Sequence, residues 1–159
     1  MSSSAIEPGK DYAALGPVLP AERLVPPFSP KVAGRIAFWF GPIAGALVSV
    51  VSLRRTGHPL RARQILRLTI AVAAVLSLIL ILLPDGIGRL FGLVAEITFY
   101  SVYPKLQEDE FAIWETANPG VESSNGWKAL GWGFLGLLLF LVITVLIAIP
   151  IAIFFPGLL

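Results

Sequence analysis

The chain has 159 residues, of which 56% are hydrophobic and only 14% are charged. A soluble domain usually carries about 25% charged residues, so this composition argues against an ordinary soluble enzyme, a disordered chain or a nucleic-acid-binding domain. The chain has no cysteine, which excludes disulfides, iron–sulfur clusters and thiolate metal sites. We therefore expect a small all-α protein that is integral to a membrane.

The first 30 residues differ from the rest of the chain. They hold six of the thirteen prolines and show no apolar periodicity. Proline removes a backbone donor and disfavours helix in the residue before it. We expect residues 1–30 to form a tail outside the membrane and residues 31–159 to form the transmembrane domain.

Four apolar runs follow, at about residues 32–53, 65–83, 87–103 and 130–155. The first, with 22 residues at about 1.5 Å each, would reach about 33 Å, enough to cross a hydrocarbon core of about 30 Å. Gly41 and Pro42 interrupt it, so we expect a kinked spanning helix, with a re-entrant hairpin as the alternative. The predicted fold is a bundle of four transmembrane helices, the second and third forming a tight hairpin.

The loop between the first two runs is rich in arginine. Together with the start of the second run it carries Arg54, Arg55, Arg61, Arg63 and Arg67. Such a cluster determines topology and can also bind lipid phosphate. With the tail outside, seven lysines and arginines lie on the inner side and five on the outer side. This count predicts that both termini are outside.

Glu96 lies in the middle of the third run, where an ionised carboxylate costs at least about 2.5 kcal/mol. One hypothesis is a proton or cation site. A second is a neutral carboxyl that fixes helix packing through a hydrogen bond to Thr69, Ser77 or Thr98. A third is a tilted or shallow span.

Small residues recur at every fourth position of the first run, at Ala37, Gly41, Gly45 and Ser49, and again at Gly88 and Gly92. Small residues let helix backbones approach closely in lipid, where no hydrophobic force drives helices together. We expect these positions to pack helices within the chain, in preference to forming a homodimer face.

The polar loop 105–126 contains a short amphipathic pattern. Leu106, Ile113 and Ala117 share one helical face, with acidic residues opposite. Three tryptophans, Trp114, Trp127 and Trp132, are candidates for an interfacial aromatic belt. The acidic face can meet a basic partner or, more simply, the arginine loop of the same chain.

No enzymatic motif is present. The sequence has no phosphate-binding loop and no nucleophile paired with a base, and its single histidine, His58, lies in the arginine loop. We therefore expect no catalytic residue, no metal and no cofactor.

Several short motifs occur along the chain: Ser29-Pro30, Phe40-Gly41-Pro42-x-Ala44-Gly45, Arg55-x-Gly57, Ala62-Arg63 and Trp127-Lys128-Ala129-Leu130-Gly131. In this order, over roughly residues 28–145, they resemble the pattern of a widespread, uncharacterised group of small bacterial polytopic membrane proteins. The chain departs from that pattern at Arg54, Arg55 and Thr56, where asparagine and leucine are more usual. The resemblance implies a four-span protein of the bacterial inner membrane and no particular activity.

These observations favour a non-enzymatic membrane protein that acts through contacts, as an accessory or assembly subunit of a larger membrane complex. Its expected partners are membrane lipids and other membrane subunits or a second copy, with no nucleic acid. The alternative is a small proton or cation channel or transporter that uses Glu96. Four helices without internal repeats make a solitary transporter less favourable.

Overall fold

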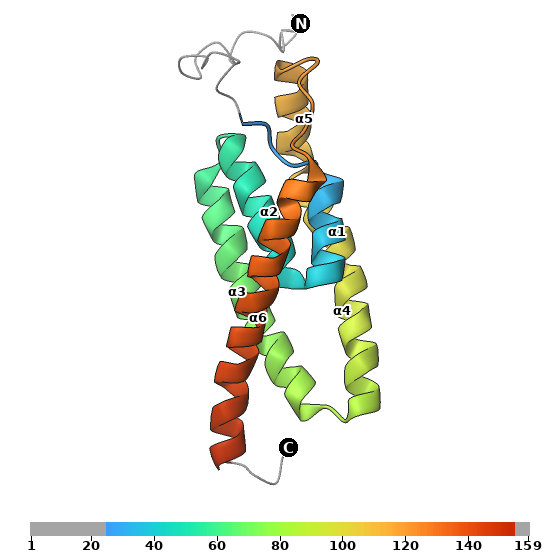
Figure 1. The fold of residues 1–159 in the computed structure, drawn as a ribbon, viewed down its shortest axis with the longest axis vertical. Helices are drawn as coiled ribbons and strands as arrows, with labels where there is room; N and C mark the ends of the chain where they lie inside the picture. Colours follow the sequence, from blue (N-terminus) through green and yellow to red (C-terminus); the bar gives the residue numbers. More distant parts are fainter. Residues whose placement is uncertain (1–24, 155–159) are drawn as a thin grey trace, which may run out of the picture.

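The computed structural model describes residues 25–154, apart from the side chain of Asp85, and its regular elements in this range are all helices, with one isolated β-bridge between Phe28 and Ser124. The helices are α1 (Pro30–Phe40), α2 (Pro42–Arg55), α3 (Pro59–Leu82), α4 (Asp85–Lys105), α5 (Glu108–Ala117) and α6 (Gly126–Phe154) (Figure 1). The all-α prediction is confirmed. The tail expected over residues 1–30 lies mostly outside the described residues.

The first apolar run is not a single helix. The chain reverses at Gly41, and α2 packs back against α1 as an antiparallel hairpin (Figure 1). At about 1.5 Å per residue α1 is about 16 Å long and α2 about 21 Å, so neither can cross a core of about 30 Å. This corrects the expected kinked spanning helix over residues 32–53, and the hairpin alternative describes the observed path.

Backbone chemistry explains the reversal. Gly41 has φ +86° and ψ 176°, a conformation that is almost confined to glycine. Its N–H donates to the carbonyl oxygen of Ala37 at 2.9 Å and closes the last turn of α1. Pro42 then begins α2 at the first helical position, where a missing N–H costs nothing.

Helix α2 lies at the centre of the bundle. It packs against α1, α3 and α6, and more lightly against α4. Most of its residues are buried, which fits a helix that is apolar around most of its circumference. The core around it is built from small and branched side chains, including Ala33, Ala37, Ala44, Ala46, Val48, Leu53, Ile65 and Ala129.

The remaining long helices form the outer part of the bundle. A tight turn joins α3 to α4, as the sequence predicts. Two helices, α3 and α6, are long and apolar enough to cross a membrane. Helix α4 is about 32 Å long by the same rise per residue. It carries Arg89 and Glu96, and it is not one of the two helices that are apolar enough to cross a membrane.

The two ends of the bundle differ in chemistry. One end, called the polar end below, gathers residues 25–29, the α2–α3 turn, α5 and residues 118–125 (Figure 1). The α3–α4 turn and the last turn of α6 lie at the opposite end. Because of the α1–α2 reversal, the described chain starts and finishes at opposite ends, which does not match the expectation that both termini share a side.

Candidate functional site

The polar end is held together by residues 25–29, which run across the end of α2. Ser52 Oγ donates to the carbonyl oxygen of Phe28 at 2.9 Å, and Ser124 N donates to that of Pro27 at 2.8 Å. Arg55 donates to the carbonyl oxygen of Pro26 at 2.9 Å, and its guanidinium lies 4.9 Å from the centre of the Phe28 ring. Partial burial lowers the pKa of Arg55. Arg55 is therefore a structural residue.

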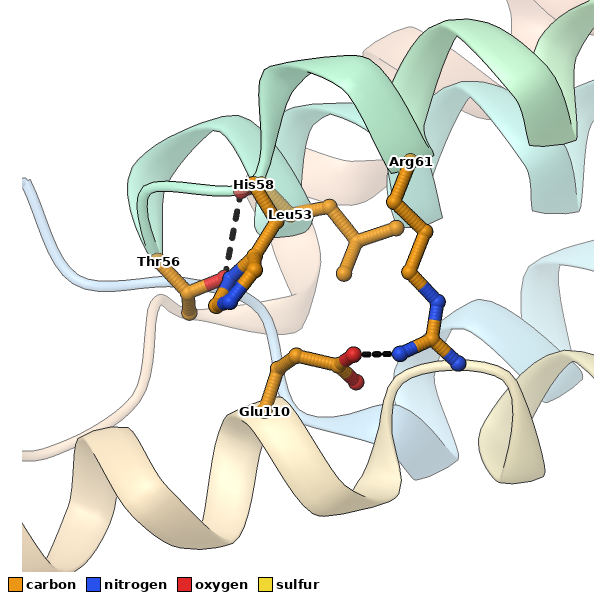
Figure 2. A network of polar contacts seen from close by, with 5 residues as sticks. All are labelled: Leu53, Thr56, His58, Arg61 and Glu110. Atoms are coloured by element: carbon orange, nitrogen blue, oxygen red, sulfur yellow. Dashed lines mark hydrogen bonds and ion pairs between the residues drawn. The ribbon is translucent and has the colours of Figure 1, made fainter.

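An ion pair attaches α5 to the rest of the bundle. Figure 2 shows Glu110 of α5 pointing toward Arg61 in the first turn of α3, and the two side chains form an ion pair. The Glu110 side chain is almost fully buried, whereas the Arg61 side chain is 43% exposed. In the adjacent turn Thr56 Oγ1 donates to the carbonyl oxygen of Leu53 at 3.1 Å. Self-pairing of the acidic loop with the arginine loop is present here through this one pair.

The arginine cluster is thus divided into two groups. Arg55 and Arg61 are held by contacts within the chain. Arg54, Arg63 and Arg67 are exposed, and within residues 25–154 they make no hydrogen bond or ion pair. Within the described residues, the charges of the second group are therefore unpaired.

Helix α5 packs on the bundle through its polar face, and the apolar face that the sequence predicts stays largely exposed. Gln107, Glu110 and Trp114, at helical spacing, are buried, while Ile113 and Ala117 are exposed. The buried Glu110–Arg61 pair fixes this orientation, and hydrophobicity alone could not predict it. Both amide atoms of Gln107 and Oε2 of Glu110 lack a hydrogen-bond partner in the described part of the chain.

Two cavities open at or near the polar end. The first, of about 660 Å³, lies against α5 and the loop after it, and is lined by Ser29, Phe111, Trp114, Glu115, Asn118, Pro119, Gly120, Val121, Glu122 and Ser123. The second, of about 340 Å³, lies between α1 and α6 and is called the α1–α6 groove below. Its lining is Val32, Arg35, Ile36, Trp39, Phe40, Asn125, Gly126, Trp127 and Leu130.

The tryptophans do not form one belt. Trp114 is buried in α5, and Trp132 is half-buried against the core. Trp127 is 78% exposed, and Trp39, which the sequence did not single out, is 76% exposed. Trp39 and Trp127 both line the α1–α6 groove.

The hydrogen-bond donors expected for Glu96 are engaged elsewhere. Tyr103 Oη donates to the carbonyl oxygen of Pro42 at 2.7 Å, so Thr69 Oγ1, 3.1 Å away, donates to Tyr103. Ser77 pairs with Thr144 at 3.0 Å, and Thr98 donates within α4. Glu96 is half-buried near the middle of α4 and has no polar partner among residues 25–154. The predicted hydrogen bond from one of these three residues is absent.

The small-residue stripe is divided by the reversal at Gly41. Gly45 and Ala37 face each other across the α1–α2 hairpin, and a Cβ on Gly45 would collide with Ala37. Gly41 itself forms the turn, with open space around it, and Ser49 is buried in α2. A Cβ on Gly88 or Gly92 would meet only ordinary contacts, at 3.8 Å and 4.0 Å, so these two are not sites of close packing within the described chain.

Close packing occurs at three glycines that the sequence reasoning missed. A Cβ on Gly34 would lie 2.6 Å from the carbonyl oxygen of Tyr100, and one on Gly133 would lie 3.0 Å from the Phe40 ring. A Cβ on Gly136 would collide with the backbone of Ala44 in α2. In α6 the spacing of Ala129, Gly133 and Gly136 was a signal that could have identified this helix contact.

Comparison of the chain with protein-family models, curated proteins and solved structures finds no match. Among the described residues, no group of three or more histidine, aspartate or glutamate side chains could hold a metal ion. The polar end carries the exposed arginines and the α5 cavity, and the α1–α6 groove opens near it. These features make the polar end the candidate site.

Proposed function

We propose that the protein is an integral membrane protein in which α3, α4 and α6 span the bilayer and α1–α2 enters it from the polar end as a re-entrant hairpin. The exposure of α6 supports this: none of its most apolar window is buried, and only 28% of the corresponding window of α3 is buried. A soluble protein would bury such helices in its core. The proposal replaces four spans with three spans and a hairpin.

The distribution of charge supports an orientation. Nine of the ten lysines and arginines between residues 25 and 154 belong to the half of the molecule at the polar end: Lys31, Arg35, Arg54, Arg55, Arg61, Arg63, Arg67, Lys105 and Lys128. Arg89 alone lies toward the opposite end. Since positive residues accumulate on the cytoplasmic side, the polar end faces the cytoplasm. The membrane proposed is the bacterial inner membrane, in line with the motif resemblance.

Within that membrane we propose a non-enzymatic role as an accessory or assembly subunit that acts through contacts. The carrying observation is that two pairs of polar side chains in the bundle, Thr69 with Tyr103 and Ser77 with Thr144, are occupied with each other and hold the helices together. The contact surfaces are the exposed apolar faces of α3, α4 and α6 and, outside the membrane, α5 with its cavity of about 660 Å³.

The test is purification in a mild detergent at native expression level, followed by identification and quantification of co-purifying proteins. We expect a stoichiometric set of membrane subunits. The double variant Glu115→Lys/Glu122→Lys, which reverses two charges in the α5 cavity, should reduce their recovery, while Lys105→Gln, outside the lining of that cavity, should not. A monodisperse lone protomer would contradict the accessory role.

A second function is favoured by one observation, the absence of a polar partner for Glu96 in the described chain. In this alternative Glu96 carries protons or cations. Proton or cation flux into proteoliposomes should then be present in the wild type and lost in both Glu96→Gln and Glu96→Leu. If none of the three proteins conducts, the accessory role stands and the channel is rejected.

A further inference from the structure

The α1–α6 groove combines an apolar body with one charge. Its walls are largely side chains of α1 and α6, including Ile36, Phe40 and Leu130. Arg35 is the only charged residue in the lining, and Lys31 lies one helical turn before it on α1. The volume of about 340 Å³ is within the range of about 300–1,000 Å³ that is typical of ligand sites.

The position of the charge along the groove is informative. Side chains on a helix lean toward its N-terminus, and the N-terminus of α1 lies at the polar end. Arg35 therefore directs its guanidinium toward the proposed cytoplasmic interface, while Ile36 and Phe40 continue toward the bilayer interior. Trp39 and Trp127, more than three-quarters exposed, flank the groove. The groove is cationic at the headgroup level and apolar below it.

We propose that the α1–α6 groove binds an anionic glycerophospholipid, with its phosphate at Arg35 and an acyl chain along Ile36, Phe40 and Leu130. This inference rests on the proposed membrane placement. Charge complementarity selects the occupant: the lining contains a cation and no carboxylate. A zwitterionic lipid would bring its own cation to the same rim, and an apolar helix of another subunit would leave Arg35 without an anion.

The experiment uses the two groove tryptophans as reporters. The full chain is reconstituted in phosphatidylcholine vesicles that contain a small fraction of brominated phosphatidylglycerol or, separately, of brominated phosphatidylcholine. Bromine on an acyl chain quenches a tryptophan that it contacts. We expect phosphatidylglycerol to quench at about fivefold lower mole fraction, the preference that one interfacial cation supplies.

Variants locate the effect in the groove. Arg35→Gln should remove the preference, Arg35→Lys should retain part of it, and Lys105→Gln, which changes an exposed cation at the end of α4, should leave it unchanged. In Trp39→Phe/Trp127→Phe, where only highly exposed side chains change, the preferential quenching should disappear.

Each remaining outcome overturns the proposal in a distinguishable way. Equal quenching by the two lipids in the wild type would exclude an anionic-lipid site while leaving the membrane placement intact. An equal loss in Lys105→Gln and Arg35→Gln would assign the preference to general surface charge. Failure of the chain to float with vesicles, with no quenching by either lipid, would reject the membrane placement together with the site.

Discussion

The hydroxyl of Tyr103 lies where α2, α3 and α4 meet. It donates to the carbonyl oxygen of Pro42 in α2 and accepts from Thr69 in α3, and the side chain is only 2% exposed. A buried polar group that loses its partner costs about 1–3 kcal/mol, because water cannot replace the bond. This hydroxyl therefore ties the tip of the α1–α2 hairpin to two longer helices.

Replacement of Tyr103 by phenylalanine should lower the free energy of unfolding by about 1–3 kcal/mol, since it removes the partner of both Pro42 and Thr69. The matched control is Tyr100→Phe, on the same helix, where the ring is half-exposed and no hydrogen bond of its hydroxyl is present among the described residues. Unfolding in detergent, followed by circular dichroism, measures both. Equal stability of the two variants would contradict the role of the Tyr103 hydroxyl.

A second prediction concerns the closest helix contact. Gly136→Leu should destabilise the fold by about 1–3 kcal/mol or more, because the side chain would overlap the Ala44 backbone. Gly131→Leu, five residues earlier on α6, meets open space and should leave the melting temperature unchanged or raise it, because leucine favours helix. Thermal unfolding in detergent distinguishes them. Equal losses would place the α2–α6 contact elsewhere.

Contacts of individual side chains are predicted from the sequence less well than the helices are. It identifies Glu96 as exceptional, but it assigns to it donors that bind other groups, because Thr69 and Ser77 have nearer partners on α4 and α6. It correctly identifies close packing at Ala37 and Gly45, but it also names Gly88 and Gly92, which pack loosely, and misses Gly133 and Gly136. Spacing within one helix does not say which neighbouring helix will face it.

Among the elements, the long apolar helices are predicted well and the α1–α2 hairpin is not. The runs 65–83, 87–103 and 130–155 correspond to α3, α4 and α6 within a few residues at most of their ends. A hydropathy sum treats residues 32–53 as one continuous segment, because hydropathy carries no information about backbone dihedral angles. The Gly41-Pro42 pair was a turn signal that the length of the run outweighed.

Because Gly41 adopts φ +86°, Gly41→Ala should cost about 1–3 kcal/mol even though no atom lies within 4 Å of the added Cβ. The control is Gly86→Ala, which also has open space but no positive φ. Chemical unfolding in detergent gives the two free energies. If Gly41→Ala is as stable as the control, then the chain does not reverse at this residue.

For the whole molecule, the reversal changes how charge is distributed across the proposed membrane. Over residues 25–154, a first span would divide the ten lysines and arginines seven against three. The hairpin places nine of the ten described cations in the half at the polar end. In the proposed topology this one turn therefore accounts for the closer agreement with the positive-inside rule.

Single cysteines test this arrangement on a background that has none. Cysteines at Val25, Gly57 and Ser123 should react with a membrane-impermeant maleimide only after the inner membrane is opened, whereas a cysteine at Gly86 should react in intact spheroplasts. All four positions are exposed. If Val25 and Gly57 react from opposite sides, α1 and α2 cross the membrane together and the hairpin is not re-entrant.

The central position of α2 has a consequence for synthesis. Helix α2 leaves the ribosome before α3, α4 and α6, yet these later helices provide much of its packing. A segment of 14 residues, about 21 Å long, is too short to stop translocation as a spanning helix. In the proposed topology the α1–α2 hairpin therefore remains at the cytoplasmic surface until α6 has been synthesised. A nascent chain that ends before Gly126 exposes one side of its central helix.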